Sequence, residues 1–395
     1  MTDKIKSIAQ SIHQEVVDIR RHIHAHPELS FAEYDTAAYI ENMLKLIGIT
    51  NIERKAGTGV VAHILGKKGA GKTIALRADI DALPITESND TIYKSKNVGV
   101  MHACGHDVHS ASLLGAAMIL HRVAEEYSGT IRLIFQPGEE KAPGGASLLI
   151  QEGVLQNPTP ASIIGQHVMP QLQVGKVGFR EGIYMASADE IYMTVKGKGG
   201  HAAMPDSNVD PVVIASHIII AMQQVVSRMA NPKIPTVVSF GKVIANGATN
   251  VIPNEVYIEG TFRTLDENWR ADAKIKMQKM AEAIAHGMGA EIDFRFMTGY
   301  PYLANAPELT RRLKQRAEMY MGNENVIDLD IWMASEDFAF YSQEIDACFY
   351  RLGVRNDAKG ITSPVHTPTF DIDENALETG SGLMAYMALC ELGCV

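Results

Sequence analysis

The sequence predicts an α/β protein in which a smaller α+β domain is inserted into a mostly parallel, helix-covered sheet. Helical and strand-like periodicities alternate over residues 1–180, and a β-α-β-β-α-β order follows from about residue 189 to residue 296. The length of 395 residues also indicates two domains, since single hydrophobic cores rarely grow beyond about 250–300 residues. We therefore assign residues 1–182 and 299–395 to the larger domain and residues 183–298 to the inserted one.

The first part of the larger domain alternates helix and strand. Strands that are separated by helices are joined by crossover connections, so this order predicts parallel pairing with helices on the faces of the sheet. Apolar side chains recur with the helical period over residues 5–24, 34–46, 107–126 and 145–152, and β-rich apolar runs occupy residues 58–65, 74–77, 130–135 and 161–165.

The inserted domain has a different order of elements. Its pattern is that of the split βαβ, ferredoxin-like unit, and its length of about 110 residues suits a small domain. Beyond Tyr300 the alternation of helix and strand resumes, which is why we interpret this domain as an insertion. The predicted strands are 189–196, 236–243, 254–262 and 291–296, and the predicted helices are 211–229 and 267–288.

Composition and charge narrow the class of protein. A hydrophobic content of 46% and a charged content of 21% are typical of soluble enzymes. The net charge of -10 disfavours nucleic acids and anionic membranes as partners, because binding phosphate requires clustered Lys and Arg. The longest apolar stretch, Val212 to Met222, is shorter than the roughly 20 residues that span a bilayer. The start of the chain has no signal pattern and the four Cys have no disulfide spacing, so we expect a cytoplasmic protein.

Candidate ligands and acid/base groups follow several of the apolar runs. In an open α/β sheet, ligands bind in the crevice at the carboxyl ends of the strands, so these side chains are expected to converge on one edge. The pattern predicts a metal site with an acid/base group beside it. The residues are Asp79, Asp81, Cys104, His106, Glu139, Glu140, His167 and His366.

Cys104 and His106 are two residues apart in a loop that leads into a predicted helix. The helix dipole is expected to favour the thiolate, and a thiolate with imidazoles suits zinc. Imidazole and carboxylate ligands elsewhere also admit manganese or cobalt. A buried small cysteine near a surface histidine explains this pair equally well, although Asp107 and His109 in the same turn favour a site.

Glu139 and Glu140 are adjacent carboxylates at a strand end, where their mutual repulsion requires a cation. Neighbours on an extended chain point in opposite directions, so one is expected to bind metal while the other faces a bound water. A solvated acidic loop is the alternative. His167 and His366 are single histidines, which more often have structural roles, whereas Asp81 could orient a ligand imidazole.

These residues lie in motifs that resemble those of the zinc-dependent amidohydrolases that include aminoacylases, hippurate hydrolases, indoleacetyl-amino-acid hydrolases and N-acetyldiaminopimelate deacetylases. The resemblance runs nearly end to end and implies a fold like that of the co-catalytic zinc exopeptidases, with an inserted lid and dimerisation domain. The motifs are Arg20–His24, His26–Phe31, Leu76–Pro84, Met101–Asp107, Phe135–Glu140, Gly197–Pro205, Asn250–Pro253, Ser335–Phe338 and the loop with His366.

The resemblance implies a role for each matching position. Glu139 corresponds to the general base, His201 to a histidine that reaches the substrate carbonyl, and Asn250 to a residue that contacts substrate. Without the resemblance, Gly197–His201 would be interpreted as a glycine-rich hinge. The positions that match ligands of two divalent metals, zinc or alternatively manganese, cobalt or nickel, are Cys104, His106, Glu140, His167 and His366.

Two short departures from the family pattern affect the loop around the carboxylates. Gly138 stands where Ala is common, and Lys141-Ala142-Pro143 replaces a shorter link. Neither removes a matched ligand. Arg263 is a further candidate for binding a substrate carboxylate, and its alternative is a charge on the face of a strand.

The expected activity is hydrolysis of the amide bond of a small N-acyl amino acid with a free carboxylate. A dipeptidase or carboxypeptidase that uses the same site is the rival among enzymes. A metal-binding protein without turnover is disfavoured because it would need ligands but not the base Glu139. The resemblance also implies a homodimer formed through the inserted domain, and leaves open whether His201 acts within its own chain or on its partner.

Overall fold

The computed structural model describes residues 1–394 and divides into two compact units, which we describe separately. Unit 1 comprises Met1–Tyr184, Ala304–Ile331 and the chain from Asp337 onward. Unit 2 comprises Met185–Leu303 together with Trp332–Glu336. The first passage from unit 1 to unit 2 follows Tyr184, two residues after the predicted boundary at 182. The return to unit 1 follows Leu303, five residues after the predicted boundary at 298. The second, short segment of unit 2 was not anticipated from the sequence.

Unit 1 is built on an eight-stranded sheet with the order β1-β2-β4-β3-β5-β16-β6-β15. The four central strands β4, β3, β5 and β16 run parallel, as predicted, whereas β1 with β2, β2 with β4, and β16 with β6 are antiparallel. The sheet is therefore mixed. The strands are β1 Ile52–Lys55, β2 Gly59–Leu65, β3 Thr73–Asp79, β4 Thr130–Gln136, β5 Ser162–Gln173, β6 Val177–Phe179, β15 Val326–Asp328 and β16 Ala347–Arg355.

The antiparallel edge has a local cause in the sequence. Only three residues separate β1 from β2, which is long enough for a hairpin and too short for the crossover that a parallel pair needs. Ala56 and Gly57 in this connection have φ values of 49° and 79°, as a tight reversal requires.

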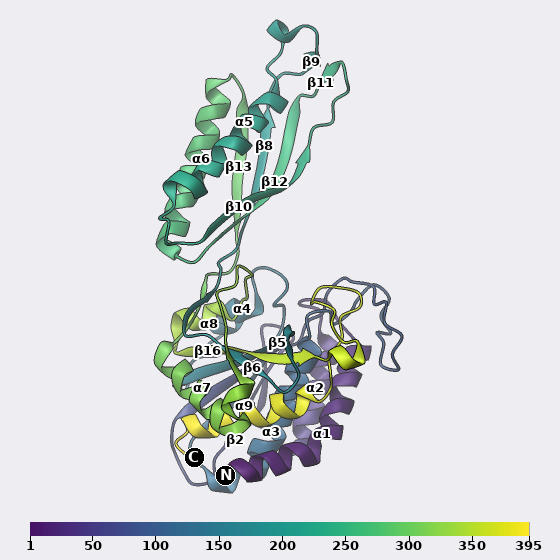
Figure 1. The fold of residues 1–395 in the computed structure, drawn as a ribbon, viewed down its shortest axis with the longest axis vertical. Coiled ribbons are helices and arrows are strands. Elements are labelled where there is room, and N and C mark those ends of the chain that lie inside the picture. Colours follow the sequence, from purple (N-terminus) through teal and green to yellow (C-terminus); the bar gives the residue numbers. More distant parts are fainter. Residues whose placement is uncertain (395) are drawn as a thin grey trace. The chain divides into compact units, whose positions relative to one another are not determined.

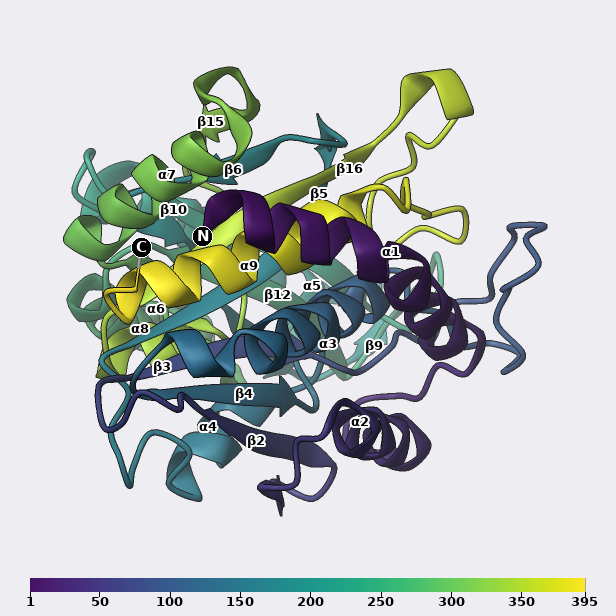
Figure 2. The same ribbon diagram turned by 90° about the horizontal axis from the view of Figure 1, so that it is seen from below.

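Helices cover the sheet of unit 1. Helices α1, α3 and α9 lie side by side over one face (Figure 2), and α3 is buried on nearly all sides because of these neighbours. All seven residues of β3 are buried, because helices cover both faces of the sheet. Strands that are covered in this way have mostly apolar sequences without polar alternation. The helices are α1 Thr2–Ala25, α2 Tyr34–Ile47, α3 His106–Arg122, α4 Gly145–Gln151, α7 Pro307–Met321, α8 Ala339–Glu344 and α9 Ala376–Glu391.

Unit 2 is an antiparallel sheet of order β10-β12-β8-β13 with helices α5 and α6 (Figure 1), which is the ferredoxin-like arrangement that its order of elements predicts. Apolar residues of both helices and of the sheet form a separate core. The elements are β8 Asp189–Lys196, α5 Pro211–Gln224, β10 Thr236–Ile244, β12 Glu255–Thr264, α6 Glu267–Gly287 and β13 Glu291–Thr298.

Helix α5 continues without a break into the short π-helix η3, Val225–Met229. The combined segment of 19 residues is long and apolar enough to cross a membrane, which corrects our expectation that the apolar stretch is too short. One such helix is weak support for a membrane span, because core helices have the same composition. Its residues Ile214, Ile218 and Met222 are buried at helical spacing in the core of unit 2.

Candidate functional site

The predicted ligands of unit 1 converge at the carboxyl ends of its central strands. Strand β3 ends at Asp79 and β4 ends at Gln136, directly before the loop with the two glutamates. Strand β5 continues to Gln173, so His167 lies within the strand and not after it, contrary to our expectation. The reason is that β16 pairs with β5 beyond this point, with His167 opposite Arg351.

Among the described residues, five groups of three side chains could each hold a metal ion, and two of these groups share Cys104. The first is Cys104, His106 and His167, all buried, with 3.4 Å between Cys104 Sγ and His167 Nε2. The second is Cys104, Glu140 and His366, in which His366 Nε2 lies 3.3 Å from Cys104 Sγ and 3.2 Å from Glu140 Oε1. In each group the ligand atoms lie within 4.8 Å of one another. Cys104 is therefore common to both candidate groups.

Glu139 and Glu140 point the same way, which is a correction to the expectation for an extended chain. Glu139 Oε2 and Glu140 Oε1 each lie 4.0 Å from His106 Nε2. The two residues form a turn after Gly138, whose φ of 59° lies in the left-handed region that favours glycine. A Cβ at Gly138 would also lie 2.3 Å from Phe31 Cε1. Glycine at this departure from the family pattern is therefore required by the turn itself.

The imidazole orientations suit metal binding through Nε2. His106 Nδ1 lies 2.9 Å from the carbonyl oxygen of Asp81 and 3.2 Å from its Oδ1, so Nδ1 is the donor and Nε2 faces the other ligands. His167 Nδ1 likewise donates to the carbonyl oxygen of Val168 at 2.8 Å. Asp81 Oδ2 accepts hydrogen bonds from Ser30 Oγ and from the backbone N–H of Glu140. Asp81 therefore holds the ring of His106 and the backbone of Glu140, two of the candidate ligands.

The electrostatics of the site call for a cation. Burial and the carboxylates of Glu140 and Glu139 raise the pKa of Cys104 well above its usual range, which overrides the expected effect of the helix dipole. Burial alone would lower the pKa of His106, but Asp79 and Asp81 raise it to about 10.

Within residues 1–394, two buried atoms of this cluster, His106 Nε2 and Glu140 Oε1, accept or donate no hydrogen bond, although His366 Nε2 lies 3.2 Å from Glu140 Oε1. A divalent cation would satisfy both atoms and would hold Cys104 as the thiolate. Thiolate, imidazole and carboxylate donors together suit zinc and admit manganese or cobalt.

A buried network behind the ligands was not recognised from the sequence. Asp79 Oδ1 lies 2.6 Å from His109 Nδ1, and His109 Nε2 accepts the backbone N–H of Val168 at 2.9 Å, next to His167. Arg77 donates to the other oxygen of Asp79 at 2.6 Å. The available signal was Arg77 itself, because a charge inside a buried apolar strand requires a fixed partner.

The predicted substrate residues all lie in unit 2, in two separate places. His201 lies on strand β9, Gly200–His201, which pairs with β11, Val251–Ile252, and the backbone N–H of Ala202 donates to the carbonyl oxygen of Asn250. Both His201 and Asn250 are exposed, and strands β9 and β11 lie at one end of the unit (Figure 1). Arg263 is the ninth residue of β12, which begins at Glu255 beside this ribbon. Eight residues of strand separate Glu255 from Arg263, which corresponds to roughly 26 Å.

The chain matches the model of the peptidase family M20/M25/M40 over residues 75–389. It belongs to this family. The N-acetyl-L-cysteine deacetylase of Bacillus subtilis is 40% identical over 93% of this chain and 86% of its own length. Thermostable carboxypeptidase 1 of Saccharolobus solfataricus is 37% identical over 98% of both chains. The crystal structure of YXEP from Bacillus subtilis, described as a dinuclear metal-binding peptidase, covers 98% of this chain and 100% of its own, with 36% identity and a TM-score of 0.83.

The comparisons confirm the resemblance, the fold class and the assignment as a hydrolase of the amidohydrolase type. The cluster in unit 1 supplies candidate metal ligands for this M20 hydrolase. The ribbon of His201 and Asn250 belongs to the inserted unit 2.

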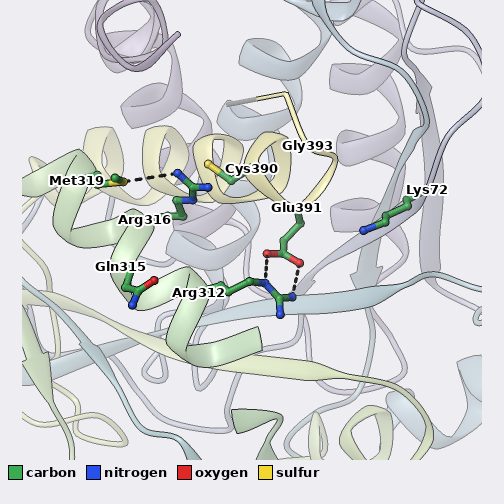
Figure 3. A pocket seen from close by; sticks show the side chains of 8 residues that line it. All are labelled: Lys72, Arg312, Gln315, Arg316, Met319, Cys390, Glu391 and Gly393. Atoms are coloured by element: carbon green, nitrogen blue, oxygen red, sulfur yellow. Dashed lines mark hydrogen bonds and ion pairs between the residues drawn. The ribbon is translucent and has the colours of Figure 1, made fainter. Parts of the chain in front are cut away.

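Unit 1 also has a hollow of about 580 Å³, lined by side chains that include Lys72, Arg312 and Glu391 (Figure 3). Lys72, which lines it, precedes the first residue of β3, whereas Asp79 at the metal cluster is the last. Arg312 in this hollow is paired with both oxygens of Glu391, at 2.8 and 3.1 Å. The hollow is therefore separate from the cluster of predicted ligands.

Proposed function

We propose that this protein is a two-metal amidohydrolase that cleaves the amide bond of small N-acyl amino acids. The observation that carries the proposal is the pair of ligand groups that share Cys104, with the carboxylate of Glu139 beside them. Cys104, His106 and His167 would hold one ion, and Cys104, Glu140 and His366 would hold the other. The N-acetyl-L-cysteine deacetylase relative supports an N-acyl amino acid as substrate.

The chain's own residues divide the chemistry between them. When bound, the two ions polarise the amide carbonyl and lower the pKa of a bound water to about 7. Glu139 accepts a proton from the attacking water and delivers it to the leaving amine. Its position is fixed by the backbone N–H of Asp337, which lies 3.4 Å from Glu139 Oε1. His201 stabilises the developing oxyanion of the substrate.

The test is release of free amine from a panel of N-acetyl and N-benzoyl amino acids. The protein is first freed of metal with a chelator and then reloaded with zinc, manganese, cobalt or nickel. We expect activity only after reloading, together with two equivalents of metal per chain by elemental analysis. Full activity of the metal-free protein would contradict the proposal. The panel also identifies the preferred acyl group and metal.

Peptide hydrolysis at the same site is the second candidate, and the carboxypeptidase relative is the observation that favours it. Dipeptides and N-blocked dipeptides belong in the same panel for this reason. A kcat/KM for dipeptides that exceeds the value for every N-acyl amino acid would replace the first proposal with this one. The two reactions use the same base and the same ligands, so only the panel separates them.

We also propose a homodimer formed through unit 2. Strand β10 is an edge of its sheet, and unpaired edges invite pairing with another copy. Large apolar side chains are exposed near this edge. Val243 on β10 is 51% exposed and Ile220 on α5 is 71% exposed, and exposed apolar patches mark interaction surfaces. Light scattering of the wild type and of Ile220→Asp tests the proposal, since the charge should weaken association.

The layout of unit 2 favours catalysis across such a dimer. Arg263 and the His201 ribbon are roughly 26 Å apart along β12, too far for one small substrate to contact both in the same copy. If both contact the substrate, they come from different subunits. We propose that His201 serves the metal centre of its partner, that the protein is cytoplasmic, and that it has no nucleic-acid or membrane partner.

A further inference from the structure

The loop that carries His366 has little structure of its own. Residues 362–371 include no helix or strand, and the side chain of His366 is 52% exposed. The backbone of His366 has a φ of 62°, in the left-handed region that is unfavourable for a non-glycine residue. A ligand on such a loop binds metal well only if neighbouring elements fix its position, because otherwise binding must also order the loop.

Three hydrogen bonds hold this loop against other parts of unit 1. The backbone N–H of His366 donates to the carbonyl oxygen of Ala103 at 2.7 Å, beside Cys104. The backbone N–H of Ser88 donates to the carbonyl oxygen of Pro368 at 2.8 Å, and Asn89 Nδ2 donates to that of Phe370 at 2.9 Å. The loop therefore depends on partners from distant segments of the chain.

The end of the loop is held by charge. Asp371 Oδ1 accepts a hydrogen bond from Arg20 Nη2 at 2.9 Å, and Asp371 Oδ2 accepts one from Tyr93 Oη at 2.8 Å. Arg20 is completely buried, and its guanidinium lies over the ring of Tyr93, 4.7 Å from the centroid. Its Nε donates to Asp107 Oδ2 at 2.7 Å.

This guanidinium joins the two ligand-bearing segments. Asp107 follows His106, a ligand of the first group, and Asp371 lies five residues after His366, a ligand of the second. A guanidinium has a rigid fork of donors and stays charged, so it holds two carboxylates in a fixed relative position, which an ammonium group does not. A buried cation is also strongly bound to its partners, because separation would leave it uncompensated.

We infer that Arg20 and Asp371 are positioning residues that fix His366 relative to His106 and thereby set the affinity of the metal position formed by Cys104, Glu140 and His366. The inference rests on the proposed two-metal function. It concerns only one of the two positions, since Cys104, His106 and His167 are buried and make no contact with Asp371 in the hydrogen bonds of the described residues.

The experiment measures bound metal per chain against buffered free zinc for the wild type, Asp371→Asn and His366→Ala. The wild type should bind zinc in two steps, and the step that His366→Ala weakens or removes is the one that uses His366. Asp371→Asn should shift that step to about tenfold higher free zinc or more and leave the other step unchanged, as expected for a residue that supports a ligand indirectly.

Asp373→Asn is the matched control. Asp373 lies two residues further along, is almost completely buried, and bonds to Asn356 Nδ2 and Lys359 Nζ instead of Arg20. If loss of stability alone weakened metal binding, Asp373→Asn would do so at least as strongly. Arg20→Lys is a second variant, since it keeps the charge but not the fork. Arg20 also holds Asp107, which follows His106, so this variant should shift the step that uses His366 at least as far as Asp371→Asn and should shift the other step too.

Each outcome decides between the explanations. Unchanged zinc steps in both Asp371→Asn and Arg20→Lys would overturn the inference, as would equal shifts of both steps in Asp371→Asn or an equal effect of Asp373→Asn. A wild type that binds fewer than two zinc ions would instead contradict the proposed function. Thermal unfolding of the metal-free variants establishes that each is folded at the temperature of the titration.

Discussion

The metal cluster of unit 1 and the His201 ribbon of unit 2 are built in opposite ways. Cys104, His106 and His167 are buried, and each of the two rings has its Nδ1 held by a fixed acceptor. His201 is exposed on a two-residue strand, and its ring accepts a hydrogen bond from the backbone N–H of Ala203, two residues away. Preorganised ligands are needed for metal affinity, whereas a residue that meets the substrate only during the reaction must remain accessible.

This difference predicts a division of labour. Every proposed metal ligand lies in unit 1, and every proposed substrate residue lies in unit 2. Substitutions in unit 1 are therefore expected to change metal content or the acid/base step, and substitutions in unit 2 are expected to change catalysis while the metals stay bound. Variants on each side can confirm or break this separation.

The largest effect is expected for Cys104→Ala. The sulfur is common to both ligand groups, so its removal weakens both metal positions, and activity should fall to the level of the metal-free protein. Elemental analysis after dialysis should find at least one metal ion per chain missing. Cys348→Ala, another buried cysteine in unit 1, is the control and should keep full metal content. An unchanged metal content in Cys104→Ala would exclude Cys104 as a ligand.

Glu139→Gln should separate chemistry from metal binding within unit 1. Loss of the general base is expected to lower kcat by roughly 10²–10⁴-fold while both metals remain bound. Glu140→Gln, its neighbour, should instead lower the metal content, because Glu140 belongs to the second ligand group. If Glu139→Gln kept more than about a tenth of the wild-type kcat, Glu139 would not be the base.

His201→Ala should lower kcat by about 10²–10³-fold without loss of metal, as expected for one group that stabilises an oxyanion. Mixing tests whether it acts on the partner. A mixed dimer of Glu139→Ala and His201→Ala subunits contains one site with both defects and one site with neither, so activity should return after co-refolding. Mixed dimers that remain inactive would show that His201 acts within its own chain.

Arg263→Met is expected to have the smallest effect, a rise in KM of about 10–100-fold for substrates with a free carboxylate, since hydrogen bonds to charged groups contribute roughly 1.5–3 kcal/mol. Among the described residues, no ion pair with a carboxylate is formed by Arg263. Its Nη1 donates a hydrogen bond to Ser335 Oγ at 3.2 Å. The methyl ester of the same substrate should be a poor substrate of the wild type, and Arg263→Met should leave the KM for this ester unchanged. Equal kcat/KM values for acid and ester in the wild type would remove the carboxylate requirement.

Much of this architecture could be predicted because it is encoded locally. Strands β3 and β4 and helices α1 and α2 lie within a few residues of their predicted ranges, since periodicity follows from the faces that each element buries. The ferredoxin-like order of unit 2 was likewise evident from its alternation of helices and strands. The candidate metal ligands that lie together in unit 1 were proposed from their motifs and from their places near strand ends, although His167 lies within β5.

Other features depend on contacts between residues that are far apart in the sequence. The shared position of Cys104 between two ligand groups requires residues 140, 167 and 366 to meet around it. Glu139 and Glu140 point the same way because a left-handed turn at Gly138 precedes them. Glycine suits this position because a Cβ there would collide with the ring of Phe31. The separation of Arg263 from His201 follows from the length of β12 between them.

The sequence by itself determined which residues can bind a metal, accept a proton or contact a substrate, because those properties belong to side chains and short motifs. Only the tertiary structure decided how they are held. Arg20 and Arg77 are buried charges that pair with carboxylates from distant segments, Asp107 for Arg20 and Asp337 for Arg77, and no local pattern specifies those partners. The physical reason is that burying a charge requires compensation at hydrogen-bonding distance, and that distance is set by the packing of the whole unit.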